Sequence, residues 1–97
     1  MIKHIVFWNI KEDLDIEGVF EEMKIRVEDM NGKIPGLLKV ELGRDFNGSE
    51  PSYQVALYSE LENREALSTY QDHPLHQLVK EFIDAVTSAR AVVDYEI

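Results

Sequence analysis

The residues between 68 and 77, STYQDHPLHQ, bring together side chains that could exchange protons. They include Tyr70 and two of the three histidines of the chain, His73 and His76, with Pro74 between them. Histidine changes its charge near neutral pH, and a tyrosine hydroxyl can polarise a carbonyl or orient a base. The stretch therefore predicts either an acid–base site or simply the start of a helix.

Pro74 favours a helix that begins at this residue, because the first N–H of a helix has no partner. The apolar residues that follow recur at helical spacing: Leu75, Leu78, Val79, Phe82, Ile83 and Val86. His73 then takes the capping position, where its side chain can satisfy a helix-end donor or face solvent. His76 lies about 100° around the helix from Leu75, at the edge of the apolar stripe. There it could be structural, or it could face a cavity between helix and sheet.

Two further side chains could reach the same space as His76. Tyr70 belongs to the apolar side of a short helix predicted over 63–71, and His4 belongs to the core-facing set of a strand predicted over 2–10. Three polar groups in an apolar pocket would suit proton transfer. A hydrogen-bonded structural cluster is the alternative interpretation of the same residues.

The elements that must position these side chains follow from the hydrophobic pattern. In chain order they are a strand over 2–10, a helix over 16–30, strands over 37–46 and 53–61, a short helix over 63–71, a helix from Pro74 and a strand over 89–97. Within 37–46, Leu38, Val40 and Leu42 are expected to face the core. The order βαββαβ predicts one α+β domain over 1–97 with a ferredoxin-like fold, a four-stranded antiparallel sheet with helices on one face.

The first strand carries apolar side chains on both of its faces. Val6 and Trp8 alternate with Ile5 and Phe7. Helices can cover only one face of such a sheet, so the other face needs a different cover. A second copy of the chain is the simplest one. We therefore predict a homodimer in which two sheets pack face to face, with Ile5 and Phe7 in the interface.

Composition excludes several classes of function. The net charge of −9 disfavours nucleic acid and anionic membranes as partners, since both need a basic surface. The absence of cysteine excludes disulfides, thiolate zinc sites and a cysteine nucleophile, and favours a cytoplasmic location. The N-terminal apolar run is too short for a membrane span. Neither the acidic residues nor the glycines form a calcium-loop or phosphate-loop pattern, so we expect no metal and no cofactor.

Several motifs resemble those of the stress-responsive dimeric α/β-barrel domain family (Dabb). They are IPGL at 34–37, ELGRD at 41–45, YQVALYSELENREALSTYQDHPLHQLVKEF at 53–82 and the closing VVDYEI. The resemblance runs almost end to end, and the spacing of Tyr70 to HPLH is its most specific part. It implies a ferredoxin-like protomer and a dimer whose two sheets form a barrel. Many members of this family have no assigned reaction.

One branch of this family, the olivetolic acid cyclase-type polyketide cyclases, is similar in the same motif. It implies a cofactor-free, aldol-type ring closure with His76 as base and Tyr70 as its partner. The expected substrate pocket, for a small apolar or aromatic molecule, is lined by His4, Val6, Trp8, Phe20 and Met23, although Phe20 and Met23 are bulky enough to fill it. A cofactor-independent monooxygenase is a further alternative. Over these alternatives the sequence favours a small, stress-linked homodimeric domain protein without an assigned reaction, in which the motif is retained for packing.

Overall fold

The computed structural model describes all 97 residues. Its elements are β1 (Ile2–Ile10), α1 (Ile16–Glu28), β2 (Leu37–Arg44), β3 (Val55–Leu61), α2 (Arg64–Asp72), α3 (Pro74–Val86) and β4 (Thr87–Glu96). The strands form one antiparallel sheet in the order β2-β3-β1-β4. This arrangement confirms the predicted ferredoxin-like α+β fold.

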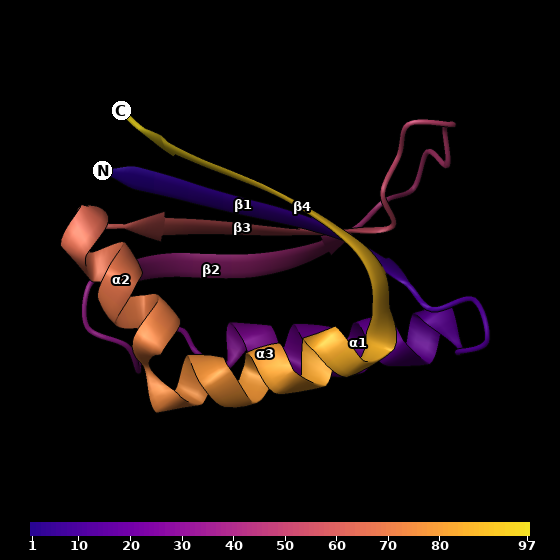
Figure 1. Cartoon of the computed structure of the whole chain (residues 1–97), viewed down its shortest axis with the longest axis horizontal. Helices are drawn as coiled ribbons and strands as arrows, with labels where there is room; N and C mark the ends of the chain where they lie inside the picture. The colour runs from indigo at the N-terminus through magenta and orange to yellow at the C-terminus, as the bar shows by residue number, and fades with distance from the viewer.

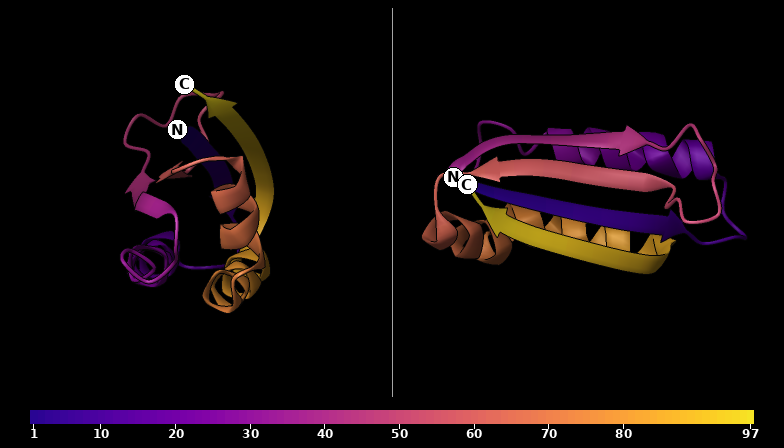
Figure 2. Two further views of the ribbon diagram at one scale, coloured as in Figure 1. Left: turned by 90° about the vertical axis from the view of Figure 1, so that its left-hand side faces the viewer. Right: turned by 90° about the horizontal axis from the view of Figure 1, so that it is seen from above.

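All three helices lie on the same side of the sheet. Figure 1 shows α1 and α3 running side by side below the strands, with α2 at the end of the sheet where both termini lie. The other face of the sheet carries no helix, as the two views of Figure 2 show. None of the helices is both long enough and apolar enough to span a membrane.

β1 lies in the middle of the sheet, and its side chains alternate between the two faces as predicted. Its buried, helix-facing residues are Ile2, His4, Val6, Trp8 and Ile10. The residues between them, including Ile5 and Phe7, are half-buried on the uncovered face. The histidine of β1 is therefore in the core, under the helices.

β4 is an edge strand that begins at Thr87, two residues earlier than predicted. Its register with β1 places Arg90 opposite Trp8 and Asp94 opposite His4. Residues directly opposite on paired strands share one face, so both charged side chains belong to the helix-facing side of the sheet. The pairing of β1 with β4 thus places Arg90 beside Trp8 and Asp94 beside His4.

Two residues that were expected to face the core are exposed instead. Leu38 is 53% exposed because the β2–β3 register shifts between Leu37 and Lys39, which turns Leu37 inward in its place. Leu78 is 64% exposed. At 3.6 residues per turn it lies about 120° from the middle of the buried Val79–Ile83 face of α3, whereas His76 lies only about 40° from it.

Candidate functional site

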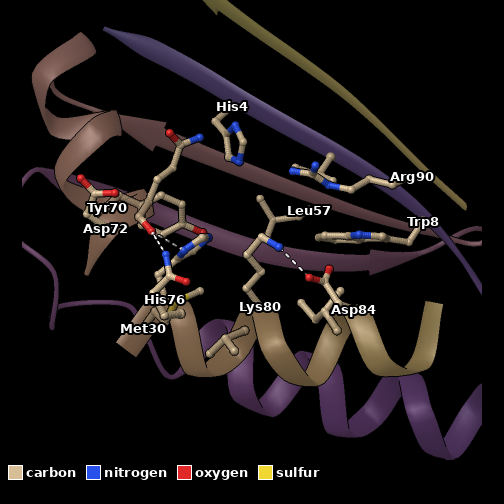
Figure 3. A pocket seen from close by; sticks show the side chains of 15 residues that line it. His4, Trp8, Met30, Leu57, Tyr70, Asp72, His76, Lys80, Asp84 and Arg90 are labelled. Carbon is tan, nitrogen blue, oxygen red and sulfur yellow. Dashed lines mark hydrogen bonds and ion pairs between the residues drawn. The ribbon is translucent and has the colours of Figure 1, made fainter. Parts of the chain in front are cut away.

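A cavity of about 210 Å³ lies between the helix-facing side of the sheet and the helices α2 and α3. Its apolar wall is formed by Val6, Trp8 and Leu57 on the sheet and by Val79 and Ile83 on α3. An apolar cavity of about 150 Å³ can hold benzene, so this space is large enough for a molecule with one ring. Figure 3 shows polar side chains at both ends of this apolar middle section.

His76 lies at one end of the cavity, in the first turn of α3. Its Nδ1 is 3.1 Å from the backbone carbonyl oxygen of Gln71. A carbonyl oxygen can only accept, so Nδ1 is the donor and carries the proton, and Nε2 keeps a free lone pair. Burial lowers the pKa of His76 below its ordinary value, and Lys80 and Arg90 add to this effect. The imidazole is therefore neutral at pH 7 and able to act as a base.

Tyr70 packs directly against His76, with ring centroids 4.3 Å apart. It is fully buried on α2, a helix that begins at the predicted cap Asn63, whose side chain accepts from the Ala66 N–H at 2.8 Å. Burial raises the pKa of the Tyr70 hydroxyl, with no opposing hydrogen bond. The hydroxyl therefore stays protonated and remains available as a donor to a bound molecule.

His4 approaches the same pair from β1. Its ring centroid is 6.0 Å from that of Tyr70 in an edge-on arrangement. Its Nδ1 donates to the Asp94 carboxylate, so Nε2 is the ring nitrogen left for the cavity. Figure 3 shows the His4 ring pointing into this space from the sheet. The three polar groups expected to converge do lie together.

The opposite end of the cavity is formed by Trp8, Lys80, Asp84 and Arg90, whose polar groups the sequence does not predict at the site. The indole Nε1 of Trp8 is buried there without a hydrogen-bond partner. Arg90 extends beside it from β4 (Figure 3). Lys80 and Asp84 form an ion pair of 2.6 Å on α3, at the cavity edge. Histidine and acidic side chains do not gather in groups of three or more that could hold a metal ion.

The comparison with protein families identifies the chain. The family model described as the stress responsive A/B barrel domain (Dabb) matches residues 2–97. The chain is a member of the Dabb family. The comparison with curated proteins gives no significant match.

Solved structures share the fold of this Dabb domain over nearly the whole chain. A dimeric protein of unknown function from Bacteroides fragilis is 32% identical, with a TM-score of 0.87 and coverage of 99% of this chain and 95% of that one. A dimeric ferredoxin-like protein of unknown function from Thermobifida fusca is 22% identical (TM-score 0.88, coverage 99% and 90%). A hydroxynitrile lyase from Passiflora edulis is 15% identical (TM-score 0.86, coverage 99% and 92%). The last two likenesses concern the fold alone.

The Dabb domain brings most of the predicted site residues together. His4, Val6, Trp8, Tyr70 and His76 all line the cavity. His73 does not line it, since its Nδ1 accepts from the Leu75 N–H at 3.1 Å and caps α3, as the simpler interpretation predicted.

Phe20 and Met23 do not line the cavity. Met23 is fully buried and Phe20 packs half-buried against the same core. Both belong to α1, which packs on β2 and α3, away from the Trp8–Arg90 pairing at the β4 edge. They fill space where α1 packs on β2, whereas the sheet residues that line the cavity belong to β1, β3 and β4.

Asp94 and Arg90 could not have been found from local sequence patterns. Both are single charged residues in a strand of mixed apolar and polar composition, and neither forms part of a recognisable motif. Their position beside the site depends on the β1–β4 register, which joins the two ends of the chain.

Proposed function

We propose that this Dabb domain is a cofactor-independent lyase or cyclase that removes a proton next to a carbonyl group. The observation that carries the proposal is the hydrogen bond from His76 Nδ1 to the Gln71 carbonyl oxygen. It fixes the tautomer in which Nε2 has no proton, and the lowered pKa of His76 keeps the ring in that state at neutral pH. A base needs this combination of a free lone pair and a neutral ring.

The proposed first step uses only His76 and Tyr70. His76 Nε2 takes the proton from the carbon next to the carbonyl, the C–H electron pair moves into the new carbon–carbon double bond, and the carbonyl electrons move to oxygen. Tyr70, packed 4.3 Å from His76 between ring centroids, donates a hydrogen bond to that developing enolate oxygen. Because burial raises its pKa, Tyr70 stabilises the enolate while keeping its own proton.

The step that follows enolate formation differs between a cyclase and a lyase. In a cyclase the enolate carbon attacks a second carbonyl of the same molecule, and the protonated His76 returns its proton to the new alkoxide. In a lyase the same steps run in reverse: His76 takes the proton of a β-hydroxyl group, the carbon–carbon bond breaks to leave a carbonyl and an enolate, and the protonated His76 returns the proton to the enolate carbon. His4, held by Asp94 and 6.0 Å from Tyr70 between ring centroids, orients the carbonyl oxygen in either direction.

A protein that binds a small molecule without converting it is the second candidate. The unpartnered Trp8 indole N–H favours it, because a buried donor of this kind serves binding whether or not a reaction follows. In that case His76 and Tyr70 would be retained as a packed pair. The dimer would then be the functional unit of a stress-linked protein.

We also propose that the chain forms a homodimer through the uncovered face of the sheet. Ile5 and Phe7 lie on that face, next to Val93 and Tyr95 of β4, which are 53% and 44% exposed. An apolar face of this kind indicates an interaction surface. The Bacteroides fragilis relative, described as dimeric, supports a dimer.

Proton exchange tests the catalytic proposal without knowledge of the natural substrate. A set of small 1,3-diketones and β-keto acids is incubated with the protein in D₂O, and loss of the acidic C–H signal is followed by NMR. We expect catalysed exchange for one compound class, reduced by about 100-fold or more in His76→Gln, since a positioned base contributes that much. Equal exchange with wild type and His76→Gln would contradict the proposal. Oxygen-dependent consumption of an aromatic compound would instead indicate the monooxygenase alternative.

A further inference from the structure

The indole N–H of Trp8 is the one buried side-chain nitrogen or oxygen in the molecule without a hydrogen-bond partner. Trp8 is only 5% exposed and lines the cavity. Buried indole N–H groups nearly always have an acceptor, because an unpaired one loses its hydrogen bond to water and gains nothing in return. The acceptor missing here can be supplied by a molecule in the cavity.

Arg90 stands directly opposite Trp8 in the β1–β4 register, on the same face of the sheet. Every lysine and arginine of the chain forms an ion pair except Lys11 and Arg90. A free guanidinium at a cavity is notable in a chain of net charge −9, where carboxylates are abundant. Figure 3 shows the Arg90 side chain extending along the sheet beside Trp8 toward the end occupied by His4.

The charged side chains around the cavity give different parts of it opposite unpaired charges. Lys80 is neutralised by Asp84 at 2.6 Å, and Asp94 is engaged by His4. Asp72, which forms no ion pair, lines the end near Tyr70 (Figure 3). The unpaired positive charge therefore lies beside Trp8, and the unpaired negative charge lies near Tyr70. An anionic group is attracted to the space beside Trp8 and repelled from the space near Tyr70.

From this arrangement we infer that the ligand is a small carbonyl acid whose carboxylate binds Trp8 Nε1–H and Arg90. One carboxylate oxygen accepts from the indole and the other from the guanidinium, which is the planar donor best matched to a carboxylate. The body of the acid lies along Val6 and Leu57, and its reactive carbon faces His76. With about 210 Å³ available, the acid carries one ring or an equivalent aliphatic chain. What happens at His76 rests on the proposed function, whereas carboxylate binding does not.

A matched pair of ligands tests the inference. 3-Phenylpropanoate and 3-phenylpropanamide have nearly the same shape, and only the first is charged. Because Trp8 is the only tryptophan, its indole N–H gives a single NMR signal that reports on this end of the cavity. We expect 3-phenylpropanoate to bind about tenfold or more tightly than the amide, because hydrogen bonds to a charged group are stronger than those to a neutral one. Its binding should also move the indole signal downfield.

Variants separate this inference from the proposed function. Arg90→Gln should remove the preference for the carboxylate, and Lys11→Gln, which alters the other unpaired cation, should keep it. His76→Gln should lose proton exchange yet still bind 3-phenylpropanoate. Equal affinity for acid and amide, or an Arg90→Gln variant that keeps the preference, would overturn the inference even if proton exchange were normal. Carboxylate binding without any exchange would support the inference and contradict the proposed reaction.

Discussion

His4 and Asp94 face each other across β1 and β4, and the imidazole Nδ1 of His4 donates a hydrogen bond to the Asp94 carboxylate. The His4 side chain is buried, whereas that of Asp94 is 36% exposed, so the pair joins the cavity to the edge of the sheet. The carboxylate can only accept, so Nδ1 of His4 carries a proton. Asp94 is therefore a positioning residue that determines which nitrogen of His4 faces the cavity.

Asp94→Ala should release the His4 ring from its fixed tautomer. Without the carboxylate, the proton can move to Nε2, and the ring ¹⁵N shifts of His4 should change accordingly. Asp94→Asn is the matched control, because its amide oxygen still accepts from Nδ1. We expect the unfolding free energy of Asp94→Ala to fall by only about 1 kcal/mol, since the carboxylate is partly exposed. An unchanged His4 tautomer in Asp94→Ala would show that the carboxylate does not position the ring.

The lowered pKa of His76 predicts a particular dependence of stability on pH. Between that lowered pKa and the ordinary value of 6.5, the unfolded chain binds a proton at this site and the folded chain does not. The unfolding free energy of the wild type should therefore decrease as pH falls through this window and level off below it. Urea denaturation from pH 8 to 4.5 should show this loss in the wild type and not in His76→Gln.

The same pKa predicts the pH profile of the proposed reaction. Desolvation keeps His76 unprotonated below pH 6.5, so C–H exchange should continue at acidic pH where an ordinary histidine is already protonated. The acid limb of the rate profile should lie below pH 6.5. A limb at 6.5 or above would mean that His76 is solvated in the working protein or that another group acts as the base.

Tyr70→Phe should separate the role of the hydroxyl from the role of the ring. The ring is fully buried against His76, and phenylalanine preserves this packing. The hydroxyl has no hydrogen bond that shifts its pKa, so its loss should change the unfolding free energy by less than about 1 kcal/mol. Proton exchange should fall by roughly 100-fold, the usual effect of removing one oxyanion donor. Thermal unfolding and the exchange assay on the same sample would distinguish the two effects.

Local patterns in the sequence predict the elements of this site, and tertiary pairing decides how they meet. The alternation of β1 correctly places His4, Val6 and Trp8 under the helices, and Pro74 correctly marks the start of α3. The spacing of apolar residues in α1 identifies the buried face of this helix but not the strand on which it packs. For that reason the pattern predicts Phe20 and Met23 in the pocket, whereas in the structure they pack in or against the core and do not line the cavity.

The residues that sequence reasoning missed depend on contacts between distant parts of the chain. Arg90 and Asp94 reach the cavity only because β4 returns antiparallel to β1 in one particular register. A shift of one residue would turn both charges to the uncovered face of the sheet. The exposure of Leu38 has a similar origin, because no Gly or Pro at residues 37–39 marks the irregularity in the β2–β3 register.

The proposed dimer can be tested at Phe7. This side chain lies on the uncovered face of the sheet, with its ring centroid 6.0 Å from that of Tyr53. In the monomer it is only half-buried, so Phe7→Asp should leave the fold intact by circular dichroism. Between two sheets, however, the new carboxylate would be buried without a partner, at a cost of roughly 3 kcal/mol or more.

Such a cost raises the dissociation constant of the dimer by more than about 100-fold. Sedimentation at micromolar concentration should therefore give a dimer for the wild type and an 11.2 kDa monomer for Phe7→Asp. Leu78→Asp is the matched control, because Leu78 is exposed on α3, on the opposite side of the sheet, and its replacement should leave the dimer unchanged. A monomeric wild type would rule out the interface. Dissociation by Leu78→Asp but not by Phe7→Asp would place the interface on the helical side instead.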